Sequence, residues 1–370
     1  MLALTNGKIV LKDSVLEQGT VLIEDGFIAD VLTHAPCLDH MELLDAKGAY
    51  VGPGFVDLHC HGGGGFWMRE DPVRAALHHL QSGTTSLLAT FAYSETEAQI
   101  TAGLHKAREA MQKGNPGNIL GVFLEGPFLN PKYGANAQSI RPYSLGEYER
   151  LMHAGEDILR MWTVAPEMPS ARTLIDALVK KGIAVAMGHS EASVEDVNWA
   201  VDHGARVCTH LMDATGASIS PPRYGGTREC GFDEAVMLRD EVFCEVIADR
   251  RGAHVRHDMI RFILKAVGLE RVAAVTDCCA QTEGGDDINL VNDELSGSKL
   301  TLLMAAKNLQ TATGLSMPSL FRLCATNPAR AIRQDDVGTI EKGKRANLVL
   351  VDGDFQLHGV LLNGKRILSY

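Results

Sequence analysis

The chain has 370 residues, of which 45% are hydrophobic, and its formal net charge is -11 at pH 7. A chain of this size can bury one large core or two domains. Because the charge is negative and the lysines and arginines are scattered, the composition argues against a basic surface for nucleic acid. We therefore expect a small-molecule partner.

No apolar run reaches the roughly 18 residues that a membrane-spanning helix requires, and the first residues lack the basic start and apolar stretch of a secretory signal. These features predict a cytoplasmic protein that does not bind a membrane. The eight cysteines stand singly apart from the Cys278-Cys279 pair, without a C-x-x-C motif. We expect reduced thiols, with Cys208, Cys244 and Cys324 filling the core.

The two ends of the chain share one pattern. Residues 1–50 and 337–370 both show short alternating strands separated by turn residues. "LTNGKIV" near the start and "LLNGKRI" near the end each place Asn-Gly between apolar residues, which is typical of a β-hairpin turn. We expect the two ends to build one small β-sandwich domain together.

Residues 51–336 differ, because apolar runs of strand length alternate there with amphipathic helical segments. "ARTLIDALVKKG" presents Leu174, Ile175 and Leu178 on one helix face, and Ser193 is suited to cap the helix in "SVEDVNWAVDHGA". Eight strand-helix units within roughly 250 residues are typical of an α/β fold of the (β/α)8 or TIM barrel type. The eight runs are "FVDLHCH", "TTSLLATF", "NILGVFLEGP", "ILRMWTVAP", "IAVAMGHS", "RVCTHL", "VFCEVIAD" and "VAAVTDC".

Histidine and acidic side chains stand where most of these runs end. In a TIM barrel the carboxyl ends of the strands converge on one face, so residues far apart in sequence become neighbours there. The residues are His59 and His61 after the first run, Glu125 after the third, His189 after the fifth, His210 after the sixth, His254 beyond the seventh and Asp277 after the eighth.

His59 and His61 form an H-x-H motif that runs into glycines 62–65. Alternate residues of a strand point to one side, so the motif presents two imidazoles to one ion while Cys60 faces the barrel wall. The glycines then allow a close approach to these side chains. With the acidic and histidine residues at the other strand ends, the motif predicts a metal site.

Imidazole and carboxylate ligands predict a divalent metal, with zinc favoured and iron or manganese also suited. Such an ion with an open position lowers the pKa of a bound water and polarises a carbonyl, which indicates a hydrolase. Asp277 is the natural general base that takes the proton and passes it to a leaving nitrogen; a helix N-cap or a bridge to a second metal are the alternatives for it. The other histidines, expected on the solvated surface, are His78, His79, His105 and His153.

The stretches that contain these residues resemble the N-acetylglucosamine-6-phosphate deacetylases of the amidohydrolase superfamily, in order and over nearly the whole chain. This resemblance implies a (β/α)8 barrel with a β-sandwich built from both termini. It also implies removal of an acetyl group from the nitrogen of an amino-sugar phosphate. The matching stretches are "PGFVDLHCHG", "FLEGPFLNP", "GHSEAS", "THLMDA", "IADRRGAHV", "AVTDCCA", "ELSGSKLTLLMAAKNL", "NPARAI" and "GTIEKGKRANLVLVD".

The resemblance implies a role for each site residue. Glu125, His189 and His210 correspond to the main metal ligands, and the H-x-H pair corresponds to a second metal position, so one or two ions are expected. Asp277 corresponds to the catalytic acid-base. Arg228 corresponds to the group that grips the phosphate, a task that guanidinium geometry suits, although an exposed loop charge is the alternative. The implied substrate contacts are Ala135, Asp213, Ala214, Arg228, His254, Leu295, Ser296 and Gly297.

Several departures from the family pattern affect the expected pocket. Asp213 stands where the family usually has asparagine, and a carboxylate beside a phosphate repels it unless it is protonated or turned towards a cation. Asn136 replaces an expected histidine, and Arg250 and Arg251 lengthen the "IADG-x-H" signature. We hypothesise that one of these arginines offsets Asp213 or takes over the anion, and that the mechanism is kept on an altered sugar or acyl group.

Other functions are compatible with parts of the pattern. Hydrolysis of a cyclic amide, an N-acyl amino acid or a ring amine would use the same metal residues and differ only in the pocket. A non-catalytic sugar-phosphate sensor would be expected to have lost a ligand or Asp277, and none is missing. A homodimer is expected, because dimers are the commonest soluble assemblies and are common in the family that the chain resembles.

Overall fold

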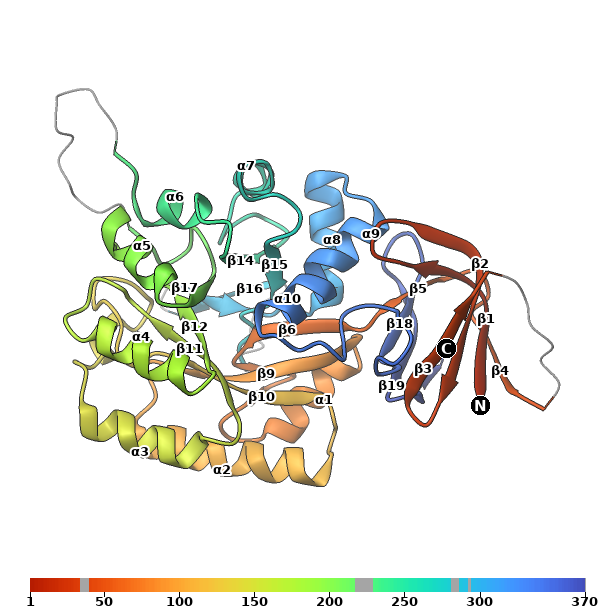
Figure 1. Ribbon diagram of the computed structural model, residues 1–370, viewed down its shortest axis with the longest axis horizontal. Coiled ribbons are helices and arrows are strands. Elements are labelled where there is room, and N and C mark those ends of the chain that lie inside the picture. The colour runs from red at the N-terminus through yellow and green to blue at the C-terminus, as the bar shows by residue number, and fades with distance from the viewer. Residues whose placement is uncertain (34–39, 217–228, 281–285, 292–293, 370) are drawn as a thin grey trace.

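The larger part of the protein is a barrel of parallel strands, and a separate sheet carries both chain termini (Figure 1). The prediction of a TIM barrel with a small domain from both ends is therefore confirmed. Arg228, the predicted phosphate ligand, lies outside the described residues. The computed structural model describes residues 1–33, 40–216, 229–280, 286–291 and 294–369.

The barrel wall consists of eight strands in chain order, each parallel to the next. It closes where the Asp277 amide donates to the His59 carbonyl at 2.8 Å and the His61 amide donates to the Cys278 carbonyl at 2.9 Å. All eight predicted runs form these strands, and nearly all of their residues are buried because both faces of the sheet are covered. The strands are β6 (Phe55–Cys60), β9 (Thr84–Ala92), β10 (Ile119–Glu125), β11 (Leu159–Val164), β12 (Ala184–Met187), β13 (Ala205–Cys208), β14 (Phe243–Ile247) and β15 (Val272–Val275).

Helices surround the barrel (Figure 1). They are α1 (Pro72–Leu80), α2 (Glu97–Lys113), α3 (Leu145–Gly155), α4 (Ala171–Lys180), α5 (Val194–Asp202), α6 (Phe232–Met237), α7 (His257–Val267), α8 (Leu302–Thr313), α9 (Met317–Phe321) and α10 (Asn327–Ala331), with a short 3-10 turn η1 (Ala137–Ser139) and a π-helical turn η2 (Arg322–Thr326). In α4, Leu174, Ile175 and Leu178 are buried, as their spacing predicts. Ser193 caps α5 because its Oγ accepts from the Asp196 amide at 3.1 Å. Within the described ranges, no helix has the length and apolar character needed to cross a membrane.

Two short hairpins extend the carboxyl end of the barrel. They are β7 (Gly62–Gly63) with β8 (Phe66–Trp67), and β16 (Ile288–Val291) with β17 (Glu294–Ser298). The second hairpin is tied to the barrel because the Ser298 amide donates to the Asp277 carbonyl at 2.8 Å. Both hairpins therefore stand beside the face where the strands end.

The terminal sheet joins the first and last segments of the chain. Its strands are β1 (Leu2–Val10), β2 (Val15–Glu24), β3 (Phe27–Leu32), β4 (Glu42–Asp45), β5 (Tyr50–Pro53), β18 (Leu348–Val351), β19 (Leu357–Leu362) and β20 (Lys365–Ser369). The two ends meet where β5 pairs with β1 on one side and with β18 on the other. Buried residues such as Leu4, Val51 and Leu350 form a core of this part that is separate from the barrel core.

The two Asn-Gly pairs of this sheet behave differently. Asn363 and Gly364 form the turn between β19 and β20 with positive φ angles of 49° and 73°, as predicted. The prediction of a turn at Asn6 and Gly7 is wrong, because both residues lie inside β1. There they form an irregularity in the register at which β1 changes its parallel partner from β4 to β5.

Candidate metal centre and active site

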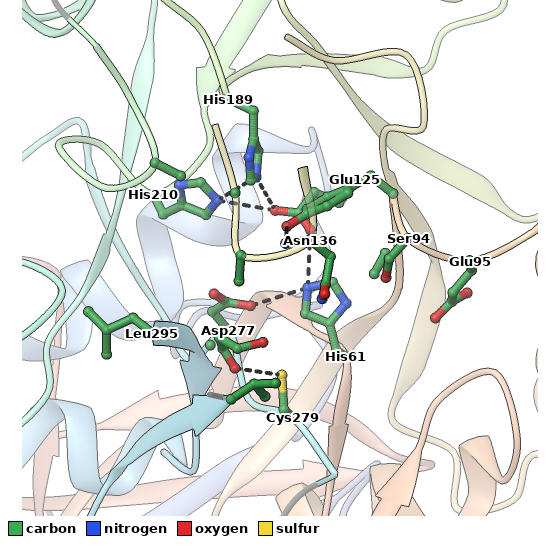
Figure 2. Close-up of a pocket in the computed structure, with 18 of the residues that line it drawn as sticks. His61, Ser94, Glu95, Glu125, Asn136, His189, His210, Asp277, Cys279 and Leu295 are labelled. Carbon is green, nitrogen blue, oxygen red and sulfur yellow. Dashed lines mark hydrogen bonds and ion pairs between the residues drawn. The ribbon is translucent and has the colours of Figure 1, made fainter. Parts of the chain in front are cut away.

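Glu125, His189 and His210 meet at the carboxyl end of the barrel (Figure 2). Glu125 is the last residue of β10, and each histidine lies two residues beyond its strand. Glu125 Oε1 is 2.9 Å from His189 Nε2 and 3.1 Å from His210 Nε2, and the two nitrogens are 3.1 Å apart. Zinc binds imidazole nitrogen at about 2.0–2.1 Å, so neighbouring ligands of a tetrahedral ion lie about 3.3 Å apart. The three side chains therefore have the spacing of ligands to one ion.

The hydrogen bonds of the two imidazoles fix which nitrogen faces the centre. His189 Nδ1 lies 3.4 Å from the Tyr133 carbonyl, and His210 Nδ1 lies 3.0 Å from the Asp213 carbonyl. A carbonyl only accepts, so each Nδ1 carries the proton and donates it. Both Nε2 atoms then turn lone pairs towards each other, an arrangement that a cation between them satisfies. The donor set fits a metal ion.

The H-x-H pair forms a second group around the same glutamate. His59 Nε2 and His61 Nε2 are 3.2 Å apart, and His61 Nε2 is 3.3 Å from Glu125 Oε2. His59 Nδ1 lies 3.2 Å from Glu245 Oε2, which orients the ring in the same way as the carbonyls orient the other two histidines. Two groups of three ligands thus share Glu125. The arrangement has room for one ion in each group.

Asp277 completes the cluster from the end of β15. Its Oδ1 lies 3.2 Å from His61 Nε2 and 3.5 Å from His59 Nε2. Burial opposes ionisation of this carboxyl, but the charge of His59 and the hydrogen bond from His61 lower the pKa of Asp277 below its usual value. The carboxylate thus faces the two imidazoles, where it can accept a proton. The alternative of a helix N-cap is wrong, because no described helix begins at Asp277.

The backbone is strained at three of these residues. His189, His210 and Asp277 have φ angles of 48°, 29° and 48°, in the left-handed region that residues with a Cβ rarely adopt. Strained residues of this kind cluster at functional sites, where the surrounding structure holds them in place. The strain turns each side chain into the centre directly after its strand.

The electrostatic field of the cluster favours positive charge. Burial opposes protonation of His61, yet its hydrogen bonds to Asp277 and Glu125 raise the pKa of His61 to about 10. The pKa of His210 is also raised to about 10, because Glu125 and the charge of Asp213 outweigh burial. A centre that draws protons onto imidazoles in this way is equally suited to a divalent cation.

A cavity of about 490 Å³ opens over this cluster. His254 stands behind its wall, with Nε2 3.2 Å from the Gly297 carbonyl and Nδ1 3.1 Å from Asp249 Oδ2. Asn136, at one of the departures from the family pattern, lines the cavity as well. The structure thus brings most of the predicted substrate contacts to one cavity. Those that line it are Ala135, Asp213, Ala214, Leu295, Ser296 and Gly297.

One side of the cavity was not predicted from the sequence. The residues that line this side are Trp67, Arg69, Tyr93, Ser94, Glu95 and Gln99. Position alone could have suggested Tyr93, Ser94 and Glu95, because they come directly after β9 of the barrel. The others lie in or beside the β7–β8 hairpin and in α2, which the barrel pattern does not indicate.

The structure does not support the hypothesis that Arg250 or Arg251 neutralises the pocket. Both side chains are about two-thirds exposed and pair with Asp286 instead, at 3.6 Å and 2.5 Å respectively. Neither residue lines the cavity as far as the described residues define it. The two arginine side chains of this loop therefore lie on the protein surface, and neither forms an ion pair with Asp213.

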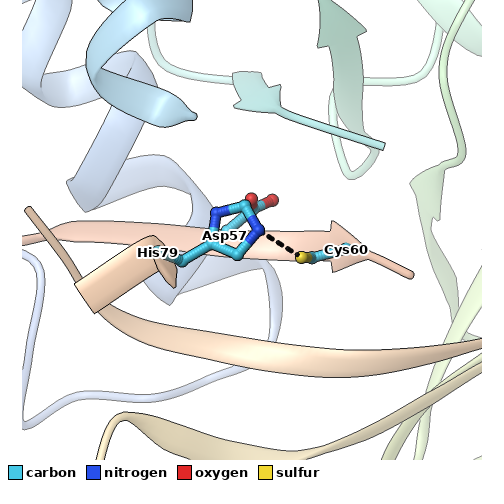
Figure 3. Close-up of side chains that lie close together, drawn as sticks. All are labelled: Asp57, Cys60 and His79. Atoms are coloured by element: carbon cyan, nitrogen blue, oxygen red, sulfur yellow. Dashed lines mark hydrogen bonds between the residues drawn. The ribbon is translucent and has the colours of Figure 1, made fainter. Parts of the chain in front are cut away.

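The prediction that His79 lies on the surface is wrong. Its side chain is fully buried behind the H-x-H motif, next to Cys60 and Asp57 (Figure 3). His79 Nε2 lies 2.9 Å from the Gly62 carbonyl and 3.1 Å from Cys60 Sγ. An added Cβ at Gly63 would lie 2.6 Å from the same nitrogen, so a larger residue there would displace the imidazole or the loop. His79 thus holds the backbone that follows His61.

Comparisons with known proteins agree with this geometry. The amidohydrolase family model matches residues 50–367. The chain is 30% identical to N-acetylglucosamine-6-phosphate deacetylase of Haemophilus influenzae, with 98% of each chain covered. It is 27% identical to N-acetylgalactosamine-6-phosphate deacetylase of Escherichia coli O157:H7, with 97% of each covered. Its fold is similar to a mutant of N-acetyl-D-glucosamine-6-phosphate deacetylase from Mycobacterium smegmatis in complex with N-acetyl-D-glucosamine-6-phosphate, with a TM-score of 0.86, 29% identity and coverage of 100% and 99%.

Proposed function

Because this chain belongs to the amidohydrolase family and, within it, to the N-acetylglucosamine-6-phosphate deacetylases, we propose that it removes the N-acetyl group of an amino-sugar phosphate. The products are acetate and the free amine. The observation that supports this proposal is that the ligand atoms of Glu125, His189 and His210 lie within 3.1 Å of one another. Asp277 lies beside them, with Oδ1 3.2 Å from His61 Nε2.

The donor set supports the proposal that these residues bind a divalent metal. Glu125, His189 and His210 would hold one divalent cation, and His59 and His61 together with Glu125 would hold a second. We propose zinc, since imidazole nitrogen and carboxylate oxygen are its usual ligands. When bound, such a cation polarises the amide carbonyl and lowers the pKa of a water.

Asp277 performs the proton transfers of the reaction. Its carboxylate faces the cluster, so it accepts the proton of the attacking water as oxygen adds to the carbonyl carbon. It then gives this proton to the nitrogen as the carbon-nitrogen bond breaks. The left-handed backbone at Asp277 fixes the carboxylate in the position from which both transfers are possible.

We propose that the sugar lies at the β17 side of the cavity. Gly297 lies close to the Asp277 carboxylate, since an added Cβ would be 3.3 Å from Asp277 Oδ1. Because Asp277 gives its proton to the leaving nitrogen, we propose that the amine leaves beside Gly297. Leu295, Ser296 and Asp213 line the same side and are proposed to contact the sugar. The glucosamine and galactosamine isomers are both proposed as substrates, because both occur among the relatives' names. Arg228 is kept as the proposed phosphate contact.

An acetate-release assay tests this function. We expect turnover of the 6-phosphates of N-acetylglucosamine or N-acetylgalactosamine, with zinc, iron and manganese supplied in turn, and weaker turnover of the unphosphorylated sugars. Asp277→Asn should lower kcat by about 10²- to 10⁴-fold while the bound metal, measured by elemental analysis, is unchanged. Release of ammonia from ring amines without acetate from any amino sugar would contradict the proposal. Size-exclusion chromatography and cell fractionation would test the proposed homodimer and cytoplasmic location.

A further inference from the structure

The cavity has a second end, opposite the one assigned to the sugar. Glu95 and Ser94 lie on one side of the metal cluster and Leu295 lies on the other (Figure 2). Trp67 and Arg69, from the hairpin that follows the H-x-H motif, line the same end as Glu95. The proposed reaction needs only a small apolar recess for the methyl of an acetyl group. The residues that line the second end, among them Arg69, Ser94 and Glu95, are polar instead.

The chemistry decides which part of a substrate enters this end. The nitrogen must lie within reach of Asp277, which is packed against Gly297. The amine and its sugar therefore extend towards Gly297. The remaining substituent of the carbonyl carbon points away from it, past His61, towards Glu95. The second end of the cavity is thus the acyl end.

An ion pair builds the wall of the acyl end. The Arg69 guanidinium lies 4.8 Å from the centre of the Trp67 ring and donates to Glu95 at 3.2 Å and to Glu70 at 2.9 Å. These contacts fix the guanidinium, which in turn fixes the Glu95 carboxylate. Glu95 is only 5% exposed, whereas the Glu70 side chain is 59% exposed and does not line the cavity.

The second oxygen of Glu95 has no hydrogen-bond donor within the described parts of the chain. Oε1 accepts from Arg69, but Oε2 is buried without a partner. A buried carboxylate oxygen left without a donor is unfavourable, and native proteins rarely keep one without a role. Since Glu95 lines the cavity, a donor on the ligand can supply the missing bond.

We propose that Glu95 makes the enzyme selective for N-acyl groups that carry a hydroxyl, of which glycolyl, or hydroxyacetyl, is the smallest. This inference rests on the proposed deacetylase function and names its acyl substrate. The hydroxyl donates to Glu95 Oε2 while the amide is hydrolysed as before. Water adds its oxygen to the carbonyl carbon, the proton passes through Asp277 to the nitrogen, and glycolate and the free amine are released.

A matched pair of substrates tests the proposal. N-glycolylglucosamine 6-phosphate and N-propionylglucosamine 6-phosphate have acyl groups of nearly the same size, and only the first carries a hydroxyl. We expect the wild-type enzyme to favour glycolyl over propionyl by about tenfold or more in kcat/KM, because a site built to bond a hydroxyl rejects the analogue without it. A ratio of one or below in the wild type would overturn the proposal.

Two variants assign the effect to the right carboxylate. Glu95→Met keeps the volume but removes the acceptor, and we expect it to bring the ratio to about one. Glu70→Gln alters the other carboxylate on Arg69, outside the cavity, and should leave the ratio as in the wild type. If the methionine variant does not fold, Glu95→Gln should also lower the ratio, since a neutral amide makes a weaker bond than a carboxylate.

The outcomes separate this proposal from the one on which it rests. Turnover of the N-acetyl substrate with no preference for glycolyl over propionyl overturns the acyl selectivity and leaves the deacetylase function standing. Turnover of none of the three N-acyl substrates by metal-loaded enzyme overturns both. A preference for glycolyl that survives in Glu95→Met overturns the assignment to Glu95.

Discussion

The two halves of the metal cluster are built differently. His189 and His210 come from two strands, and backbone carbonyls accept the protons of their Nδ1 atoms. His59 and His61 come from one strand. The Glu245 side chain supports His59, whereas His61 Nδ1 has no partner within the described residues. Backbone carbonyls therefore orient the two imidazoles of the first half. The second half depends on side chains that single substitutions can remove.

Glu125→Gln should weaken metal binding in both halves of the cluster, because Glu125 belongs to both groups of ligands. We expect loss of metal from both groups and a fall in kcat/KM of about 10³-fold or more. A metal contributes several kcal/mol to transition-state stabilisation, and about 1.4 kcal/mol corresponds to tenfold in rate. Elemental analysis and acetate release measure the two effects. Full metal content in this variant would mean that the glutamate is not a shared ligand.

Glu245→Gln should act mainly on the H-x-H half. Glutamine keeps an oxygen that can accept from His59 Nδ1 and from the His210 amide, but it removes the charge that makes the His59 ring more basic. We expect affinity for the ion at His59 and His61 to fall by about 10- to 100-fold. Titration against a chelator measures both sites. An equal loss at the two sites would contradict the separation into halves.

Gly63→Ala should disturb the same half through the backbone. The added Cβ would lie 2.6 Å from His79 Nε2, so either the loop after His61 or the buried imidazole has to move. We expect a loss of about 1–3 kcal/mol in the free energy of unfolding and lower metal occupancy of the H-x-H half. Urea unfolding and metal analysis report these effects. Gly353→Ala is the control, since its Cβ would meet nothing within 4 Å.

The smallest expected effect is a pH dependence from His79. Burial lowers the pKa of His79 from 6.5 to about 4. Between these values the unfolded chain binds a proton that the folded protein does not, so this residue makes the free energy of unfolding decrease as the pH falls from 6.5 to 4. His79→Phe should make that decrease less steep over the same window, as measured by urea unfolding at several pH values. Parallel curves for variant and wild type would show that the buried imidazole is not the cause.

Individual residues show which features a local sequence pattern can predict and which it cannot. The Asn363-Gly364 turn was predictable because a two-residue turn between apolar strands requires positive φ, which these residues tolerate. The same pair at Asn6 and Gly7 forms an irregularity inside β1 instead, because two strands from later in the chain pair with the parts of β1 before and after it. His79 looked like a surface residue since its burial depends on the hairpin that folds over it.

The sequence by itself determined the barrel, because apolar runs of strand length have to be covered on both faces. It also determined which side chains stand at the ends of the strands. Closure of the barrel decided the rest. Only when Asp277 pairs with the backbone of His59 do their side chains come to face a common centre. The pairing of Arg69 with Glu95, and the buried oxygen that it leaves without a donor, likewise exist only in the folded chain. Such contacts join segments whose local sequences carry no information about each other.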